Sequence, residues 1–468
     1  MTRSRRAALA SLVAACVLPV IWPGDIPFIN DEPMLVINAV RANRAGSLAE
    51  MGLRGTFGFT YGPFPTWVYQ ALTAITHDLV VLSALHAALL AATTAAALWW
   101  LSRSLRLWPW FAVVPLLSPY FWFFARLLWD NPFLIPLGAL AIAGYAAQLS
   151  SESSWGLRVA VAAMIAGLLV HLMSIALVVP LGLHMVAVRW RALWQHRISV
   201  AVIVLAGVGL AWPYWHLLAT HPTVALPRAP SIDGVLFPIF GGELLSARRL
   251  ERFFGTGALH GAGLNAAVVV SCLAYPLVWA GFVLAARGIV GAVRRREWTA
   301  RTHIATILLG GLACQAAIGA MSGKFGHSQY YNGTWIVFTL LAWVAVDFLV
   351  ERRSPIRWSG VAITGLLAAA LLATVVTIAV RLHRSHGTRG VYGPTISNQQ
   401  RVARTIARFS PSSRVVPHVS LYKRYPHTLA ILRELNPGPP GDRRDWDADV
   451  RYASDDPASG AIEVVRHR

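Results

Sequence analysis

The chain has 468 residues, of which 56% are hydrophobic and only 13% are charged. A soluble globule could not bury so much apolar surface, so the composition excludes an ordinary soluble enzyme and indicates a polytopic membrane protein. The formal net charge is +20, but many of the arginines flank apolar runs, as in membrane proteins. We therefore expect membrane lipids, and no nucleic acid, as partners.

Apolar runs long enough to cross about 30 Å of hydrocarbon as helices recur along the chain. We predict eleven spans, at residues 7–23, 79–101, 110–128, 132–149, 158–171, 174–188, 199–218, 264–287, 303–321, 333–350 and 359–380. The segment 158–188 could form one long helix or a hairpin of two helices. Arginine clusters flank alternate ends of the spans only if this segment returns on itself, so the positive-inside rule favours the hairpin.

The same rule places the N-terminus on the cytoplasmic side of the membrane and the C-terminus on the outer side. We expect a multi-pass protein of a bacterial-type cytoplasmic (inner) membrane. Two long outer loops then result, at residues 24–78 and 219–263, whereas the inner loops are short. Residues 1–380 form the predicted transmembrane domain. Residues 381–468 are more polar and mix helix-like with strand-like segments, which predicts a small α/β domain outside the membrane. We therefore expect the active site on the outer face.

Acidic residues are scarce in this chain, and an adjacent pair follows the first apolar run. Asp31 and Glu32 lie in the first predicted outer loop, immediately before Pro33. An ionisable group at a membrane is a functional candidate because its burial costs free energy. The plain alternative for Asp31 is a solvated loop acid.

Another acid, Asp130, lies between the third and fourth predicted spans among mostly apolar residues. It could be a functional group, or it could cap the next helix through Asn131-Pro132, and one residue can do both. Arg126 lies one helical turn earlier. It could pair with Asp130, reach a phosphate, or extend to the membrane interface.

A cation with aromatic neighbours precedes the tenth predicted span. Lys324 is one of only two lysines in the chain, and His327 and Tyr330 follow it closely. A compact ammonium group suits a phosphate, whereas an interfacial lysine among aromatic residues is also a common membrane anchor. The sequence leaves both interpretations open.

The order of these features resembles the GT-C superfamily of membrane glycosyltransferases, in particular its protein O-mannosyltransferase and aminoarabinose-transferase types. The resemblance rests on the acidic pair after the first span, on Tyr61-Gly62-Pro63 before the second, and on Asp130 in the sequence Leu128-Trp129-Asp130-Asn131-Pro132. His171 falls where many relatives carry a Lys or His. The likeness covers about residues 1–380, and it departs from the relatives at Asn332–Trp335, where they have a proline-rich stretch.

The resemblance implies an all-α polytopic fold of about eleven transmembrane helices with a small C-terminal α/β appendage. It also implies an inverting hexosyl- or pentosyltransferase that moves a sugar from a polyprenyl-phosphate donor to a hydroxyl acceptor, which could be a lipid, a glycan or a protein. Such a reaction needs a carboxylate to take the acceptor proton, and donors or cations to hold the departing phosphate. Relatives differ in their use of a divalent metal, so a cation between the acids and the phosphate is left open.

Roles for individual residues follow from the resemblance. Asp31 is the predicted general base, with Glu32 and Asp130 also catalytic. The predicted ligands of the donor phosphate are Lys324, His327 and Arg126. The predicted substrate contacts are Tyr61, Trp129, His171 and Tyr330. For His171, a structural role as a buried histidine is the plain alternative.

Two other classes of function remain to be weighed against the transferase. A transporter or flippase for a lipid-linked or anionic substrate would place charges deep within several spans and repeat its halves, whereas the charges here gather at the outer rim. A scaffold with a decayed site is the third possibility. It would tolerate Asp31→Asn, and an enzyme would not.

Overall fold

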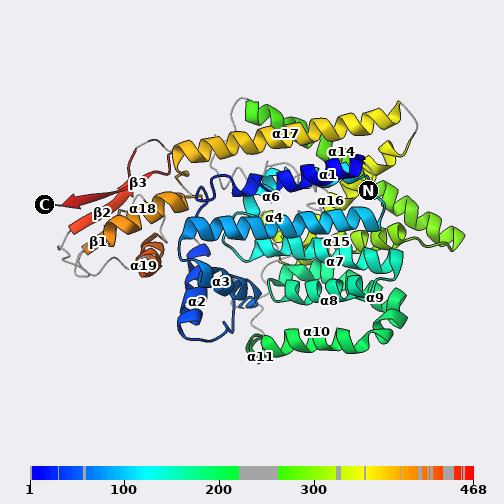
Figure 1. Cartoon of the computed structure of the whole chain (residues 1–468), viewed down its shortest axis with the longest axis horizontal. Helices are drawn as coiled ribbons and strands as arrows, with labels where there is room; N and C mark the ends of the chain where they lie inside the picture. The colour runs from blue at the N-terminus through cyan, green and yellow to red at the C-terminus, as the bar shows by residue number, and fades with distance from the viewer. Residues whose placement is uncertain are drawn as a thin grey trace.

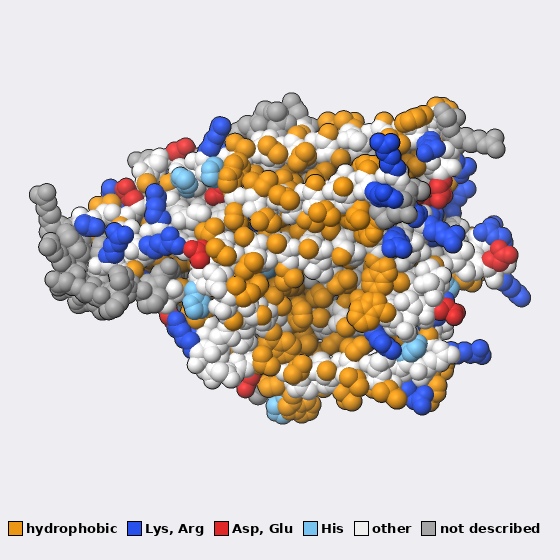
Figure 2. Space-filling view, viewed as in Figure 1, with side chains coloured by type: hydrophobic (Ala, Val, Ile, Leu, Met, Phe, Trp, Pro, Cys, Tyr) orange, Lys and Arg blue, Asp and Glu red, His pale blue; other side chains and the backbone are white. Residues whose placement is uncertain are grey.

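The computed structural model describes residues 3–29, 31–55, 60–220, 262–322, 328–352, 355–389, 392–408, 414–418, 421, 425–435, 447–454, 456 and 459–467. Long helices form a bundle, and a small appendage that carries the C-terminus lies at one end of it (Figure 1). On the face shown in Figure 2 a broad hydrophobic belt covers the bundle, and many Lys and Arg side chains gather at the end opposite the appendage.

The first half of the bundle alternates long helices with short ones. Its elements are α1 (Arg3–Ala15), η1 (Leu18–Val20), α2 (Glu32–Arg44), α3 (Phe64–Ile75), α4 (Leu79–Ser104), η2 (Pro109–Ala112), α5 (Val113–Leu116), α6 (Pro119–Phe124), η3 (Asn131–Phe133), α7 (Leu134–Ser151) and α8 (Ser154–Leu168), where η marks a 3₁₀ helix. Three of the short helices, η2, α6 and η3, have a proline in their first turn, where its missing N–H costs nothing.

The second half consists mostly of long apolar helices. They are η4 (Leu172–Ser174), α9 (Ile175–Gln195), α10 (Arg197–Leu210), α11 (Trp212–Thr220), α14 (Ala262–Arg295), α15 (Ala300–Ser322), η7 (Ser328–Thr334), α16 (Trp335–Val350) and α17 (Ile356–Ser385). Residues 158–188 fall on α8 and α9, two helices that pack against each other, in agreement with the predicted hairpin.

The fold is all-α and polytopic, as predicted, but the predicted number of eleven spans is not confirmed. Seven described helices are long and apolar enough to cross a membrane, and the α10–α11 pair, bent by 72°, brings the number to eight if it is one span. Residues 7–23 and 110–128 are helical only in pieces. Prolines at 19, 115 and 119 interrupt these segments, because proline lacks the N–H that a continuous helix needs.

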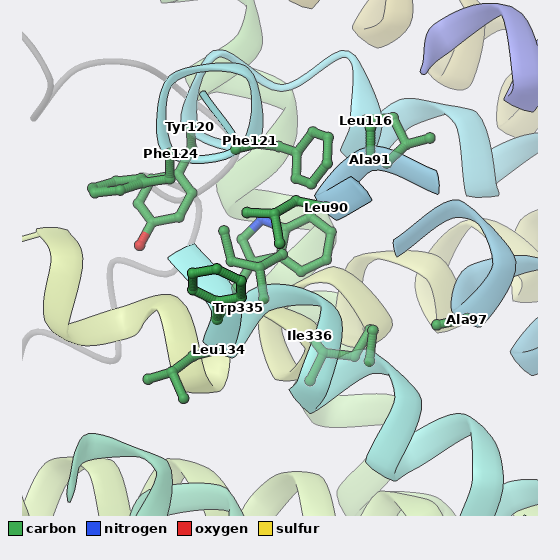
Figure 3. Close-up of a cluster of buried hydrophobic side chains, with 14 of the residues drawn as sticks. Leu90, Ala91, Ala97, Leu116, Tyr120, Phe121, Phe124, Leu134, Trp335 and Ile336 are labelled. Atoms are coloured by element: carbon green, nitrogen blue, oxygen red, sulfur yellow. The ribbon is translucent and has the colours of Figure 1, made fainter. Parts of the chain in front are cut away.

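Buried aromatic side chains hold the middle of the bundle together. Phe121 of α6 lies 5.8 Å from Trp335 of α16 between ring centroids. Leu90 of α4 and Leu134 of α7 meet the same cluster (Figure 3). This packing fixes the ends of α6, α7 and α16, and with them the short segments that carry the polar residues described below.

The appendage is a three-stranded sheet with two helices. Its elements are α18 (Ile396–Ile406), β1 (Arg414–Pro417), α19 (Tyr425–Leu435), β2 (Asp447–Tyr452) and β3 (Ile462–His467). β1 pairs with β2 in parallel, and β2 pairs with β3 in antiparallel register. This agrees with the expected α/β appendage. Most of the second predicted outer loop, residues 219–263, lies outside the described residues.

Candidate active site

The acidic pair lies at the beginning of α2. Asp31 is the N-cap residue of this helix, and Pro33 occupies its first turn, where its fixed φ favours helix initiation. The Asp31 carbonyl accepts a hydrogen bond from the Leu35 N–H at 3.1 Å, but the Asp31 side chain makes no capping bond. Asp31 is half-buried and Glu32 is buried. The Asp31 carboxylate is therefore not used to cap its own helix.

Asp130 is buried at the start of η3, with 1% of its surface exposed. Its Oδ1 accepts the Asn131 N–H at 2.7 Å, so the predicted capping role is present. Its Oδ2 is buried and has no hydrogen-bond partner among the described residues. Burial, together with the charge of Asp31, raises the pKa of Asp130 to about 8. The two acids thus share one electrostatic environment, in which Asp130 favours its neutral form.

Tyr61 is held in place by backbone contacts on both sides. Its N–H donates to the Leu53 carbonyl at 2.7 Å, and its carbonyl accepts the Gly52 N–H at 2.9 Å. The Tyr61 ring stacks on His171, with the ring centroids 4.0 Å apart. Burial and the charges of Asp130 and Asp31 raise the pKa of its hydroxyl, so Tyr61 stays a hydrogen-bond donor at neutral pH.

His171 is a buried residue between α8 and α9. Its Nδ1 accepts the Met173 N–H at 3.1 Å, so the neutral ring carries its proton on Nε2. This Nε2 has no partner in the described part of the chain. Burial lowers the pKa of His171 to about 3, which keeps the imidazole neutral. His171 therefore makes a structural hydrogen bond through Nδ1, while its Nε2–H donor has no described acceptor.

Tyr330 comes from the 3₁₀ helix η7, which packs against both η3 and η4. Its ring centroid lies 6.3 Å from that of His171. The structure thus brings together Asp31, Asp130, Tyr61, His171 and Tyr330, which come from five separate segments of the sequence.

Four other predicted residues are Trp129, Arg126, Lys324 and His327. Trp129 is half-buried beside Asp130. Arg126 is buried over the Trp122 ring and donates to the backbone carbonyls of Trp22 and Asp25, so its phosphate-binding role stays a prediction. Lys324 and His327 lie outside the described residues.

Sequence reasoning missed two polar pairs close to these residues. The Tyr69 hydroxyl lies 3.2 Å from Nδ1 of the buried His86, and it donates to the Trp129 carbonyl at 3.4 Å. The Tyr120 hydroxyl donates to Asn332 Oδ1 at 2.6 Å, next to Tyr330. A lone histidine within the apolar run 79–101 was the available signal for the first pair.

Metal ligands are few at this site. In the ranges that the structure describes, no group of three or more His, Cys, Asp or Glu residues lies close enough to hold a metal ion. A cation between Asp31 and Asp130 would therefore take further ligands from substrate phosphate or water.

The helical bundle and its small appendage have a fold that is also seen in solved structures of ArnT. The solved structures that share it include ArnT from Cupriavidus metallidurans bound to undecaprenyl phosphate, with a TM-score of 0.54 and 12% sequence identity over 98% of this chain and 97% of that chain. The apo state of the same ArnT gives a TM-score of 0.54 and 13% identity over 97% of this chain and 94% of that one. No protein-family model and no curated protein matches the sequence. The expected polytopic helical fold with a small C-terminal appendage is thereby confirmed, but the number of spans is not.

Proposed function

We propose that this chain is a membrane glycosyltransferase that moves a sugar from a polyprenyl-phosphate donor to a hydroxyl acceptor. The observation that carries the proposal is the juxtaposition of Asp31 with the buried Asp130, beside Tyr61 and His171. Support for the donor class comes from the fold, since an ArnT structure with the same fold is bound to undecaprenyl phosphate.

Asp31 acts as the general base in this proposal. The acceptor hydroxyl oxygen attacks the anomeric carbon of the sugar while Asp31 takes its proton, and the bond from that carbon to the phosphate oxygen breaks with its electrons going to the phosphate. Attack from the face opposite the phosphate inverts the anomeric centre. Asp130 favours its protonated form and so already carries a proton near neutral pH, which leaves the half-buried Asp31 to act as the base.

The other residues bind the substrates. Lys324 and His327 neutralise the departing phosphate, and Glu32 helps to place the acceptor. The uncommitted Nε2–H of His171, with the rings of Tyr61, Tyr330 and Trp129, binds the sugar through hydrogen bonds and stacking. Tyr61, His171 and Tyr330 come from three segments that meet, so the donor sugar would be held among them.

The proposed reaction takes place on the outer face of a cytoplasmic membrane. The hydrophobic belt in Figure 2 separates the appendage end from an end rich in Lys and Arg, as expected when the latter faces the cytoplasm. A lipid-linked donor suits this setting, because nucleotide sugars are not available outside that membrane.

The test is mass spectrometry of polyprenyl lipids extracted from a strain lacking this protein. The strain is restored with wild type, with Asp31→Asn, or with Glu50→Gln, at matched membrane levels. Glu50 is an exposed acid of the same predicted outer loop and serves as the matched control. Loss of a general base typically costs about 10²- to 10⁴-fold in rate, so the Asn variant should behave as the deletion.

The expected result is a polyprenyl-phosphate sugar that accumulates in the deletion and with Asp31→Asn and disappears with wild type and Glu50→Gln. Its mass would identify the donor sugar. If Asp31→Asn clears the lipid as fast as wild type does, Asp31 is no general base, and the transporter or scaffold alternative replaces the transferase.

A further inference from the structure

The backbone that leads to Asp31 is paired with the beginning of the appendage. The Ile26 carbonyl accepts the Ile396 N–H at 2.9 Å, and the Gly24 carbonyl accepts the Ser397 N–H at 3.0 Å. Next to these bonds, Pro27 and Thr395 form an antiparallel bridge. Residues 24–27 are therefore aligned by α18 and the residues just before it, and not by the helical bundle alone.

Ile29, two residues before Asp31, is part of the hydrophobic core of the appendage. It is fully buried in one cluster with Val402 of α18, Leu429 of α19 and Ile462 of β3. Its carbonyl also accepts a hydrogen bond from the Thr428 hydroxyl at 3.4 Å. The core of the appendage is thus completed by a side chain of the segment that carries the proposed base.

Gly393, just before α18, packs closely against the Ile29 side chain. Its backbone is left-handed, with a φ of +71°, and a Cβ there would lie 2.5 Å from Ile29 Cδ1. Only glycine meets both demands, since it tolerates a positive φ and leaves room for the isoleucine.

α2 is held by the appendage at its far end as well. Arg41 and Arg44 of α2 pair with Glu434 of α19 at 2.6 and 3.2 Å. α19 lies against α2, so the appendage contacts the segment before Asp31 and the helix after it (Figure 1).

A second set of contacts ties this arrangement to the segment that carries Asp130. Arg126, four residues before Asp130, donates to the Trp22 and Asp25 carbonyls. Tyr392 donates its hydroxyl to the same Asp25 carbonyl at 2.6 Å. The Asp25 carboxylate binds His383 Nδ1 at 2.8 Å. These contacts around Asp25 therefore connect the segment before Asp31, the segment before Asp130 and the chain that enters the appendage.

We propose that the appendage is a positioning element of the active site, which holds residues 24–29 and α2 so that Asp31 stays in register with Asp130. Ile29 and Tyr392 are its positioning residues, and Arg126 links the two acidic segments. This inference rests on the proposed role of Asp31. Displacement of a reacting group by about 1 Å can cost on the order of 100-fold in rate, so loosening this contact should act on kcat.

The test compares Ile29→Ala with Val402→Ala in the purified full-length chain. Both substitutions shorten a buried aliphatic side chain of the same cluster, but Val402→Ala leaves the Ile29 side chain itself intact. Ile29→Val and Tyr392→Phe complete the set, the first as a conservative rescue and the second as a variant without the bond to Asp25. Hydrogen exchange of the amides of residues 26–37 is measured together with kcat and KM for the lipid donor.

Ile29→Ala should speed exchange in this segment and lower kcat on the order of tenfold or more, with KM changed less than about twofold. Tyr392→Phe should act in the same direction, whereas Val402→Ala and Ile29→Val should keep kcat within about twofold of wild type. The proposal is overturned if exchange does not change, if it changes without loss of kcat, or if Val402→Ala lowers kcat as much as Ile29→Ala does.

Asp31→Asn separates this proposal from the proposed function. It should abolish transfer without faster exchange of residues 26–37. Should Asp31→Asn retain activity, the proposed base is wrong, while the exchange data still report whether the appendage orders this segment.

Discussion

Asp130 combines two roles that the sequence left as alternatives. Its Oδ1 caps η3, and its Oδ2 is buried without a partner among the described residues. Such an atom is costly to bury as a charge, and the neighbouring Asp31 adds to the cost. Protonation of Asp130 relieves both, which is why its pKa rises to about 8.

The raised pKa predicts that the difference in stability between wild type and Asp130→Asn depends on pH. The carboxyl titrates near 8 in the folded protein against a usual value of 3.8, so between these pH values the folded state binds more protons than the unfolded state. The free energy of unfolding therefore falls as pH rises through this window, by at most about 1.4 kcal/mol per pH unit. Asn lacks this dependence, and its stability relative to wild type should increase from pH 5 to pH 8.

Denaturation in detergent at several pH values measures this difference, with the exposed-acid variant Glu50→Gln as the control. Glu50→Gln should follow wild type at each pH. A constant difference between Asp130→Asn and wild type from pH 5 to pH 8 would show that Asp130 is ionised throughout.

Short segments between the helices, rather than the helices themselves, carry the candidate site. η3, η4, η7 and the residues around Tyr61 meet because their flanking helices are packed together. Gly62 is a point of close approach, since a Cβ there would lie 2.2 Å from the Leu169 carbonyl oxygen. The Phe64 N–H donates to the same carbonyl at 3.2 Å.

Gly62→Ala is therefore predicted to push Tyr61 away from His171. Overpacking of this kind costs roughly 1–3 kcal/mol of stability, and the displaced ring should also lower transfer activity. Gly209→Ala in α10 is the matched control, because a Cβ at that position meets no atom within 4 Å. It should be neutral or stabilising by up to about 1 kcal/mol, since alanine favours a helix more than glycine does.

Denaturation and transfer assays on the same two preparations measure both effects. If Gly62→Ala keeps the stability and activity of wild type, the Tyr61 segment can move without harm, and the stack on His171 is not needed for the reaction.

The sequence predicted the apolar helices well because each long run needs only its own composition to form a helix in a membrane. It overestimated the spans where prolines divide a run, as at Pro115 and Pro119. It missed β2, although Ala448, Val450 and Tyr452 alternate as a half-buried strand should. The stack of Tyr61 on His171 could not be predicted, because it depends on how distant helices pack and not on any local pattern.

At the scale of the whole molecule, polar networks lie at both ends of the bundle. The candidate site and the appendage occupy one end. At the other, Asp347 of α16 accepts the Trp108 N–H at 2.7 Å and pairs with Arg301 of α15 at 2.9 Å. Arg301 also donates to the Leu105 and Arg106 carbonyls at 2.8 and 2.9 Å. This second network joins α15 and α16 to the turn after α4.

Asp347→Asn should therefore lower stability and spare the reaction. Asn keeps an acceptor for Trp108 but loses the ion pair with Arg301, which is 40% exposed, so we expect a loss of about 1–3 kcal/mol. The value of kcat per folded molecule should stay within about twofold of wild type. Glu351→Gln is the control, because Glu351 meets the same Arg301 at 3.3 Å but is largely exposed, and it should change stability by less than about 1 kcal/mol.

Asp31→Asn should give the opposite pattern, with transfer lost and stability nearly unchanged, because Asp31 is half-buried and does not cap its helix. The two variants measured side by side thus distinguish an end of the bundle that performs the reaction from an end that holds the helices together. If Asp347→Asn lowered kcat as strongly as Asp31→Asn at equal amounts of folded protein, the two ends would be coupled through the helices. The chemistry could then not be assigned to the acidic pair alone.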